Sequence, residues 1–216
     1  MSKSRLVVLI SGSGSNLQAI IDHIDAGEIN ASILSVISNK ADAYGLERAK
    51  VAGIATAVVD HTHYENRELF DQALAEIIDQ VSPDIIVLAG FMRILTKDFV
   101  MRFAGKLINI HPSLLPLYRG LHTHKRALQD KASEHGASVH FVTPELDSGA
   151  VITQGIVSVN HKDTEETLAM RVHQIEHIIY PQAVKLLTEN QVELRTDHIY
   201  INNQLLQQPK LYHLKK

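Results

Sequence analysis

The sequence predicts an α/β fold, with a mostly parallel, twisted sheet that carries helices on both faces and an antiparallel addition towards the C-terminus. Two observations support this class. Short β-branched apolar runs alternate with helix-like periodic segments along residues 7–110, which is typical of right-handed βαβ units. After Pro112 the pattern changes to two longer alternating stretches separated by a turn, which predicts strands that pair antiparallel.

The first half contains five buried strands with helices between them. Continuous apolar runs, as expected for strands buried on both faces, occupy residues 7–10, 33–37, 55–59, 85–89 and 107–110. Apolar residues recur at helical spacing over residues 17–24, 46–50, 62–81 and 99–103. Thr62 and Glu65 have the spacing of a capping box that would open the third helix.

The second half contains two strands, a long helix and a C-terminal hairpin. Residues 138–143 and 151–159 alternate as strands do, with Asp147-Ser148-Gly149 as the turn between them. Periodic apolar residues from Leu168 to Ile179 predict a helix that ends or kinks at Tyr180-Pro181. Asn202-Asn203 marks the turn of the hairpin. No linker-like segment interrupts the chain, so we expect a single domain over residues 1–216.

Composition and charge exclude several classes of protein. The 216 residues are 45% hydrophobic and 21% charged, which fits a globular domain and not a disordered chain. The formal net charge of −3 argues against a nucleic-acid partner. The lack of cysteine removes disulfides and thiolate chemistry. The sequence has no signal-peptide pattern and no long apolar run, so we expect a cytoplasmic protein with no membrane partner.

A glycine-rich loop, Gly12-Ser13-Gly14-Ser15-Asn16, joins the first strand to the first helix. Glycine allows close backbone approach, and the N-terminus of the following helix directs N–H groups towards an anion. The dinucleotide fingerprint is broken because Leu17 takes the place of its third glycine, and no acidic residue ends the second strand. The loop therefore favours a single phosphate group; the alternative is a tight turn capped by Ser15 or Asn16.

Asn109 and His111 end the fifth strand two positions apart, so their side chains leave the same face. Pro112 disfavours helix at His111, and open α/β sheets bind ligands at the carboxyl ends of their strands. A carboxamide can donate to a developing oxyanion, and an imidazole can transfer a proton near neutral pH. We interpret the pair as catalytic; the alternative is a buried, hydrogen-bonded Asn and His at a strand end.

Asp147 lies in the turn between the two later strands. An aspartate in such a turn commonly accepts hydrogen bonds from backbone N–H groups. A second interpretation places its carboxylate beside His111, where it would favour the imidazolium form. The residue pattern alone leaves both interpretations open.

Six segments together resemble the folate-dependent formyltransferase family. They lie within residues 5–187 in the family's order and spacing, and they are ISGSGSNLQAII, SNKADAYGLERA, LAGFMRIL, NIHPSLLP, GLHTHKRAL and HGASVHFVTPELDSGAVI. The resemblance implies a Rossmann-like formyltransferase fold and transfer of a formyl group from 10-formyltetrahydrofolate to an amine, without a metal. It also implies a phosphate-binding half over residues 1–105 and a folate-binding, catalytic half over residues 106–216.

The resemblance further implies roles for individual residues. Asn109, His111 and Asp147 fall on catalytic positions, where they would stabilise the tetrahedral intermediate and relay a proton. The amine substrate would be bound by Gly14, Ser15 and Asn16, at its phosphate, and by Glu176, at its ribose. The residues that would contact the folate are Arg67, Met92, Arg93, Ile94, Leu95, Asn109, Thr143, Pro144, Glu145, Leu146 and Asp147. We expect these two small molecules as partners, and a monomer or homodimer.

The chain departs from the family pattern in the loop that would line the folate. Pro144, Ser148 and Ala150 stand where an acidic residue, glycine and proline are common. These departures concern the backbone shape of the loop and leave the catalytic carboxylate in place.

Three alternatives remain open from the sequence. Another folate-dependent formyltransferase, or a formyltetrahydrofolate hydrolase, would share the three catalytic positions. A metal hydrolase would use His61-x-His63 or His122-x-His124, although the second motif has no acidic residue nearby in the sequence. A non-catalytic sensor of a phosphoribosyl compound or a folate would keep the pocket without turnover.

Overall fold

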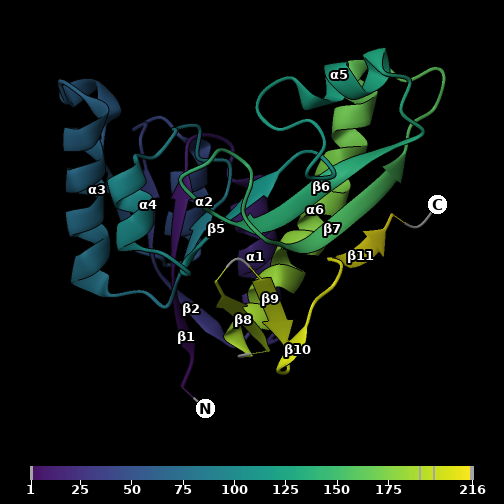
Figure 1. Cartoon of the computed structure of the whole chain (residues 1–216). Coiled ribbons are helices and arrows are strands. Elements are labelled where there is room, and N and C mark those ends of the chain that lie inside the picture. The colour runs from purple at the N-terminus through teal and green to yellow at the C-terminus, as the bar shows by residue number, and fades with distance from the viewer. Residues whose placement is uncertain (1, 190, 197, 215–216) are drawn as a thin grey trace. The chain divides into compact units, whose positions relative to one another are not determined.

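The computed structural model describes residues 2–189, 191–196 and 198–214. The chain forms two compact units, residues 1–109 (unit 1) and residues 110–216 (unit 2). Each unit combines strands with helices (Figure 1), which confirms the α/β class that the sequence predicts.

Unit 1 is built on a parallel sheet. Among the described residues its strands are β1 (Ser4–Ile10), β2 (Ala31–Ser38), β3 (Thr56–Val58), β4 (Ile85–Leu88) and the first part of β5 (Leu107–His111). Their order is β5-β4-β1-β2-β3, and every pair in this unit is parallel. The chain first moves from β1 towards β3 and then returns to the other side of β1 at β4. Loops that follow β1 and β4 therefore lie at a topological switch point, where open α/β sheets bind ligands.

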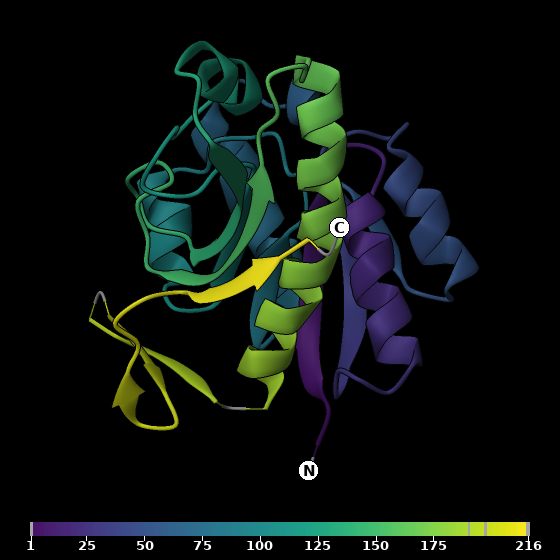
Figure 2. The same cartoon turned by 90° about the vertical axis from the view of Figure 1, so that its right-hand side faces the viewer.

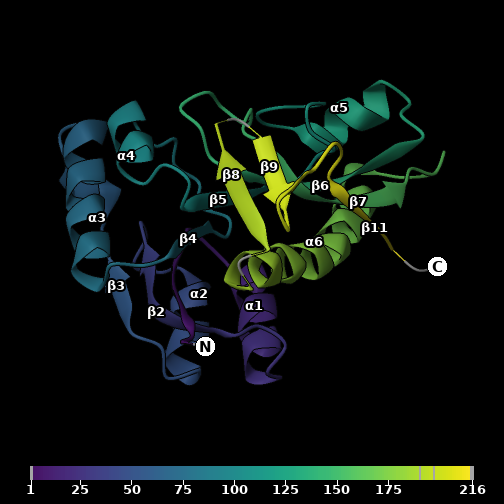
Figure 3. The same ribbon diagram turned by 60° about the horizontal axis from the view of Figure 1, so that its bottom comes forward.

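Helices cover both faces of this sheet. They are α1 (Ser15–Asp25), α2 (Tyr44–Val51), α3 (Arg67–Val81) and α4 (Lys97–Arg102), with a short 3₁₀ helix over His61–His63. Figure 3 shows α1 and α2 on one side of the strands and α3 and α4 on the other, as right-handed crossovers require for this strand order. Leu9, Ile20, Leu74 and Ile86 are fully buried between these layers.

The start of α3 differs from the prediction. The Thr62–Glu65 capping box is wrong, because Thr62 lies in the 3₁₀ helix and its hydroxyl donates to Asp60 Oδ1 at 2.8 Å. Asn66 caps α3 instead, since its side-chain oxygen accepts the Leu69 N–H at 2.9 Å. Asx residues rank highest as N-caps, and Asn66 thus delays the helix past both residues of the expected box.

Unit 2 contains an antiparallel strand pair covered by a long helix. Its elements up to that helix are α5 (Thr123–Gln129), β6 (Glu134–Phe141), β7 (Val151–Ser158) and α6 (Glu165–Thr188). The pairing of β6 with β7 is antiparallel, which confirms the prediction for this segment. A Cβ at Gly155 would lie 2.3 Å from Ile175 Cγ1, so glycine is needed for α6 to pack this closely on β7.

The helix α6 runs through Pro181 without ending there, and Figure 2 shows it as one long green helix. Proline inside a helix removes one backbone hydrogen bond and costs about 3 kcal/mol. Tyr180, Pro181, Ala183 and Val184 are all buried, and their packing offsets that loss. Of the two outcomes expected at Pro181, the helix end is therefore wrong.

The C-terminal segment forms a small antiparallel sheet and one added strand. Strands β8 (Val192–Arg195), β9 (His198–Ile201) and β10 (Gln204–Leu205) pair in the order β10-β9-β8. The predicted hairpin turn at Asn202-Asn203 is confirmed, and both residues have positive φ angles of 50° and 66°. Strand β11 (Lys210–His213), which the sequence pattern did not indicate, pairs in parallel with β7. Within the described ranges, none of the helices is both long and apolar enough for a bilayer span.

Candidate active site

The imidazole of His111 and the carboxylate of Asp147 face each other in unit 2. His111 ends β5, and Asp147 lies in the loop between β6 and β7. Their Nδ1 and Oδ2 atoms are 3.3 Å apart, and each side chain is 8% exposed. The same Oδ2 accepts the Gly120 N–H at 2.9 Å. The carboxylate therefore does both things that the sequence left open: it accepts a backbone N–H group and lies beside His111.

The second ring nitrogen of His111 also faces an oxygen atom. Its Nε2 lies 3.0 Å from the backbone carbonyl oxygen of Tyr118. A neutral imidazole donates from one nitrogen, whereas an imidazolium donates from both. Both ring nitrogens therefore face oxygen acceptors. An imidazole held in this way can transfer a proton to a reacting atom.

Buried polar side chains hold the turn that follows His111. The Ser138 hydroxyl accepts the Leu115 N–H at 3.0 Å and donates to the Ser113 carbonyl oxygen at 2.7 Å. The Gln154 amide donates to the Leu115 carbonyl oxygen at 2.8 Å and to the Ser138 hydroxyl at 2.9 Å. Strands β6 and β7 therefore fix the backbone directly after the imidazole. Positioning of this kind keeps a catalytic group in its reactive geometry.

The loop that carries Asp147 is closed by its own hydroxyl groups. Thr143 Oγ1 and Ser148 Oγ both donate to the Glu145 carbonyl oxygen, at 3.0 and 3.1 Å. Asp147 has a left-handed φ of 49°, and a Cβ at Gly149 would lie 1.9 Å from the Phe141 carbonyl oxygen. The departure from the family pattern at Ser148 therefore adds a hydrogen bond that stabilises the loop.

His140 packs behind Asp147. Its Nε2 atom lies 3.8 Å from Asp147 Oδ1, and its Nδ1 atom is 2.8 Å from the Phe141 carbonyl oxygen. Because a carbonyl oxygen only accepts, Nδ1 carries the proton. Burial lowers the pKa of His140 below its ordinary value. The residue thus contributes a neutral ring to the wall of the site.

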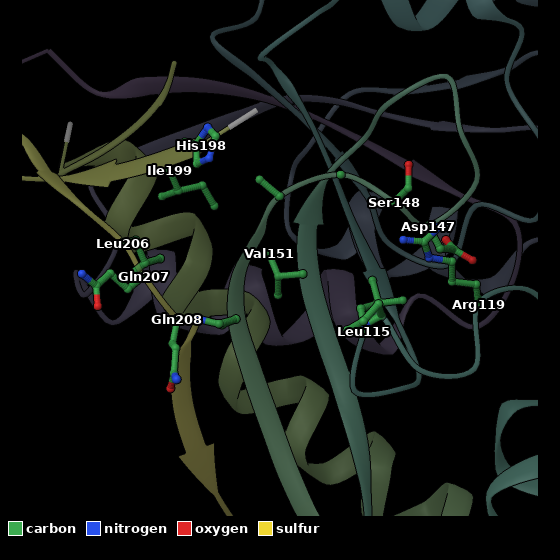
Figure 4. A pocket seen from close by; sticks show the side chains of 14 residues that line it. Leu115, Arg119, Asp147, Ser148, Val151, His198, Ile199, Leu206, Gln207 and Gln208 are labelled. Carbon is green, nitrogen blue, oxygen red and sulfur yellow. The ribbon is translucent and has the colours of Figure 1, made fainter. Parts of the chain in front are cut away.

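A cavity of about 280 Å³ adjoins Asp147. Figure 4 shows Asp147 and Arg119 on one side, His198 and Gln208 on the other, and Val151 between them. The walls combine apolar side chains, such as Leu115, Val151 and Leu206, with polar ones.

The glycine-rich loop of unit 1 leads directly into α1. Gly14 is the N-cap residue of α1 with a left-handed φ of 69°, and no side chain caps the helix. A Cβ on Gly14 would lie 2.5 Å from the Gly45 Cα, so the loop and the start of α2 touch through their backbones. The capped-turn alternative, with Ser15 or Asn16 as the cap, is wrong, because these residues form the first turn of the helix.

The loops after β1 and β4 are tied together within unit 1. The Ser11 hydroxyl accepts the Met92 N–H at 2.7 Å and donates to Asn39 Oδ1 at 2.6 Å. The segment that the family resemblance assigns to folate starts at Met92. Met92 and Ile94 are 74% and 60% exposed, so this loop presents apolar side chains to solvent. Exposed apolar residues gathered on one loop often mark a binding surface.

The remaining predicted residues lie on several elements. Arg67 is the first residue of α3 and is exposed, and Asn109 is half-buried in β5, two residues before His111. Glu176 is buried on α6. Among the predicted site residues, the structure therefore joins His111 to Asp147 in unit 2, and the Ser11 hydroxyl links the two predicted binding loops in unit 1.

The two His-x-His motifs have other contacts. His61 Nδ1 lies 3.1 Å from the Asn39 carbonyl oxygen, and His124 Nδ1 lies 3.1 Å from His135 Nε2. His122 is the N-cap residue of α5, as the expected helix start requires. In the part of the chain that the structure describes, no three acidic or histidine side chains are grouped as ligands for a metal.

Three contributors to the site were missed by the sequence analysis. The Tyr118 carbonyl and the Gly120 N–H are backbone groups, and no residue pattern signals which backbone group will meet a distant side chain. His140 could have been found, because strand alternation from Ser138 places it on the same face of β6, close in sequence to Asp147.

The structure is thus that of an α/β protein with a buried imidazole–carboxylate pair at the end of β5. A family model described as formyl transferase matches residues 4–184, so the chain belongs to the formyl transferase family and is an enzyme of that class.

Relatives that match nearly the whole chain carry the name of a more specific enzyme. The phosphoribosylglycinamide formyltransferase of Escherichia coli (strain K12) is 50% identical over 201 residues, which are 93% of this chain and 95% of that protein. The protein of the same name from Haemophilus influenzae is 46% identical over 202 residues, or 94% and 95% of the two chains. The structure of phosphoribosylglycinamide formyltransferase from Coxiella burnetii has a TM-score of 0.93 and 46% identity, and the match covers 97% and 99% of the two chains.

Proposed function

We propose that this enzyme transfers the formyl group of 10-formyltetrahydrofolate to the amine of glycinamide ribonucleotide, a one-carbon step of de novo purine (IMP) synthesis. The observation that carries the proposal is the buried contact between His111 and Asp147. His111 ends β5, and the same strand bears Asn109 two residues earlier. The full-length similarity to phosphoribosylglycinamide formyltransferases supports the choice of substrate.

The proposed reaction needs no protein nucleophile, because the substrate amine attacks the formyl carbon directly. The formyl oxygen becomes negative in the tetrahedral intermediate. The Asn109 amide would donate to that oxygen, and so would the His111 imidazolium, whose Nε2 would exchange the Tyr118 carbonyl oxygen for the substrate. One such donor is worth about 3 kcal/mol. Asp147 would orient the His111 ring. His111, or a water bound by Asp147, would then carry the amine proton to the leaving folate nitrogen.

The binding residues are assigned by their chemistry. The uncapped N-terminus of α1, with Gly14, Ser15 and Asn16, would bind the substrate phosphate, and the Glu176 carboxylate would accept the ribose hydroxyl groups. Binding far from the reacting centre supplies positioning energy. The folate would contact the segments from Met92 to Leu95 and from Thr143 to Asp147, with Arg67 as a further contact. Exposed apolar side chains in both segments would pack against the flat faces of an aromatic ring system.

A direct assay tests the proposal. Purified enzyme is incubated with 10-formyltetrahydrofolate and glycinamide ribonucleotide, and both the formylated amine and free tetrahydrofolate are measured. We expect equal amounts of the two products. Release of tetrahydrofolate without an amine would indicate the hydrolase, and formylation of methionyl-tRNA in a parallel reaction would indicate another family member.

Two variants test the residue roles. His111→Ala and Asp147→Asn should bind glycinamide ribonucleotide with nearly unchanged affinity and lose most of their turnover. Turnover that survives in both variants would contradict the catalytic assignment. The single family model that matches residues 4–184 supports the expectation that both units serve one formyltransferase domain.

A further inference from the structure

Arg48 of α2 contacts the glycine-rich loop with one hydrogen bond and the following helix α1 with another. Its Nε group donates to the Ser13 carbonyl oxygen at 2.8 Å, and its Nη1 group donates to Gln18 Oε1 at 3.3 Å. Ser13 lies inside the loop, and Gln18 lies on the first turns of α1. The planar guanidinium therefore bridges the loop and the helix that the loop opens.

The guanidinium is itself restrained. The Arg48 Cζ atom lies 5.0 Å from the centroid of the Tyr44 ring on the same helix, a cation–π contact that limits its movement. The other cation of α2, Lys50, pairs with Glu47 at 2.6 Å. Among the described residues of α2, Arg48 is therefore the cation that contacts the loop.

The backbone of α2 supports the same loop. The Gly45 N–H donates to the Gly12 carbonyl oxygen at 3.0 Å. A Cβ at Gly45 would lie 3.1 Å from the Gly14 Cα and 2.5 Å from Ile10 Cδ1. The carbonyl oxygens of Gly12 and Ser13 are thus both bound by donors from α2. The partial negative charges of two carbonyl oxygens, which would repel an anion, are thereby directed towards donors on α2.

We infer that Arg48 is a positioning residue for the phosphate of the substrate: it fixes the loop so that the N-terminus of α1 accepts a phosphate group. The inference rests on the proposed function. A guanidinium has five N–H donors; one of them holds the loop at Ser13, and another holds α1 at Gln18. Its charge also favours a dianion at the uncapped helix end. Lysine would keep the charge but could not hold two acceptors in one plane.

The experiment compares two substrates that differ only in the phosphate group. Steady-state rates are measured with glycinamide ribonucleotide and with its dephosphorylated riboside, for the wild type, Arg48→Met and Arg48→Lys. Lys50→Met is the matched control, because it removes one positive charge from the same helix and leaves the loop contacts intact. Thermal unfolding of each variant is recorded alongside.

We expect Arg48→Met to raise the KM for glycinamide ribonucleotide about tenfold, as for loss of hydrogen bonds to a charged group, while kcat changes less than about twofold. The KM for the riboside should stay the same, Arg48→Lys should recover only part of the loss, and Lys50→Met should match the wild type. An unchanged KM in Arg48→Met, an equal loss for both substrates, or full recovery by Arg48→Lys would each overturn the inference.

Failure of the proposed function is recognised in the wild type alone. A wild type that does not formylate glycinamide ribonucleotide, or that uses the riboside equally well, would refute the phosphate site itself and with it the role of Arg48. A wild type that prefers the ribonucleotide, combined with insensitive Arg48 variants, would refute only the role of Arg48.

Discussion

His135 makes the stability of the fold depend on pH. Its ring is completely buried in β6, with Nε2 3.1 Å from His124 Nδ1 and its edge towards the Tyr118 ring. Burial, and to a smaller extent the charge of His124, lowers the pKa of His135 from 6.5 to about 4. Between these values the unfolded chain binds the proton and the folded protein does not. The contribution of the buried, neutral ring to the free energy of unfolding is therefore fully present above about pH 6.5. It is lost as the pH drops towards 4.

The size of the effect follows from the shift. One pKa unit corresponds to roughly 1.4 kcal/mol, so a shift from 6.5 to about 4 is worth about 3 kcal/mol over the whole range. At pH 5 about 2 kcal/mol of this has been lost. Urea unfolding at about pH 8 and about pH 5 measures the difference for the wild type and for His135→Gln, which does not titrate.

We expect the difference in unfolding free energy between the two pH values to shrink by about 2 kcal/mol in His135→Gln. His161→Gln is the matched control, because that side chain is exposed, and it should keep the wild-type difference. If His135→Gln retained the full pH dependence, the reasoning from burial would be refuted, whatever the absolute stability of the variant.

Three further predictions concern single residues. Gly14→Ala places a Cβ 2.5 Å from the Gly45 Cα at a φ of +69°, so the unfolding free energy from urea titration should fall by about 2 kcal/mol; an unchanged midpoint would speak against this close approach. Asn66→Ala removes the oxygen that accepts a backbone N–H of α3 at 2.9 Å, so the unfolding free energy in the same titration should fall by about 1 kcal/mol. An unchanged unfolding free energy would show that Asn66 does not stabilise the start of the helix. The hydrogen bond from Arg171 is the main cause that lowers the pKa of Asp163 from 3.8 to about 2, so its stabilisation is complete above the ordinary value and is lost as the pH falls towards 2. Calorimetry of Asp163→Asn should therefore show a weaker pH dependence in this acidic range, and an unaltered one would exclude the ion pair as its source.

Local patterns were sufficient for most strands and helices because their signals are contained in short segments. The apolar run before Gly12 and the alternating residues before Asp147, for example, form strands β1 and β6 as expected. Asn202-Asn203 also specifies its turn locally, since asparagine tolerates positive φ.

The errors arose where tertiary packing or a competing local signal decided the outcome. Asn66 is a better N-cap than Thr62, and both lie within a few residues of each other. Pro181 is a helix breaker by local rules, yet the buried face of α6 outweighs its cost. Strand β11 is short, and it exists because β7 offers it a partner.

The candidate site was predictable in its side chains and not in its backbone partners. The residue types of Asn109, His111 and Asp147 suggested a catalytic set, and the structure brings His111 and Asp147 together. The Tyr118 carbonyl and the Gly120 N–H that complete the contacts of the imidazole and the carboxylate carry no such signal. Arg48 was also invisible, because an arginine on an amphipathic helix is usually solvated, and its acceptor on Ser13 is distant in the chain.

The strand β11 lies along β7 and bonds to its residues Thr153 to Ile156. Unpaired strand edges recruit other chains and promote aggregation. The last strand thus pairs with backbone donors and acceptors of β7 that would otherwise be exposed. An enzyme shortened before Lys210 would expose that edge, and its principal defect would be self-association in concentrated solution, with the contact between His111 and Asp147 left intact.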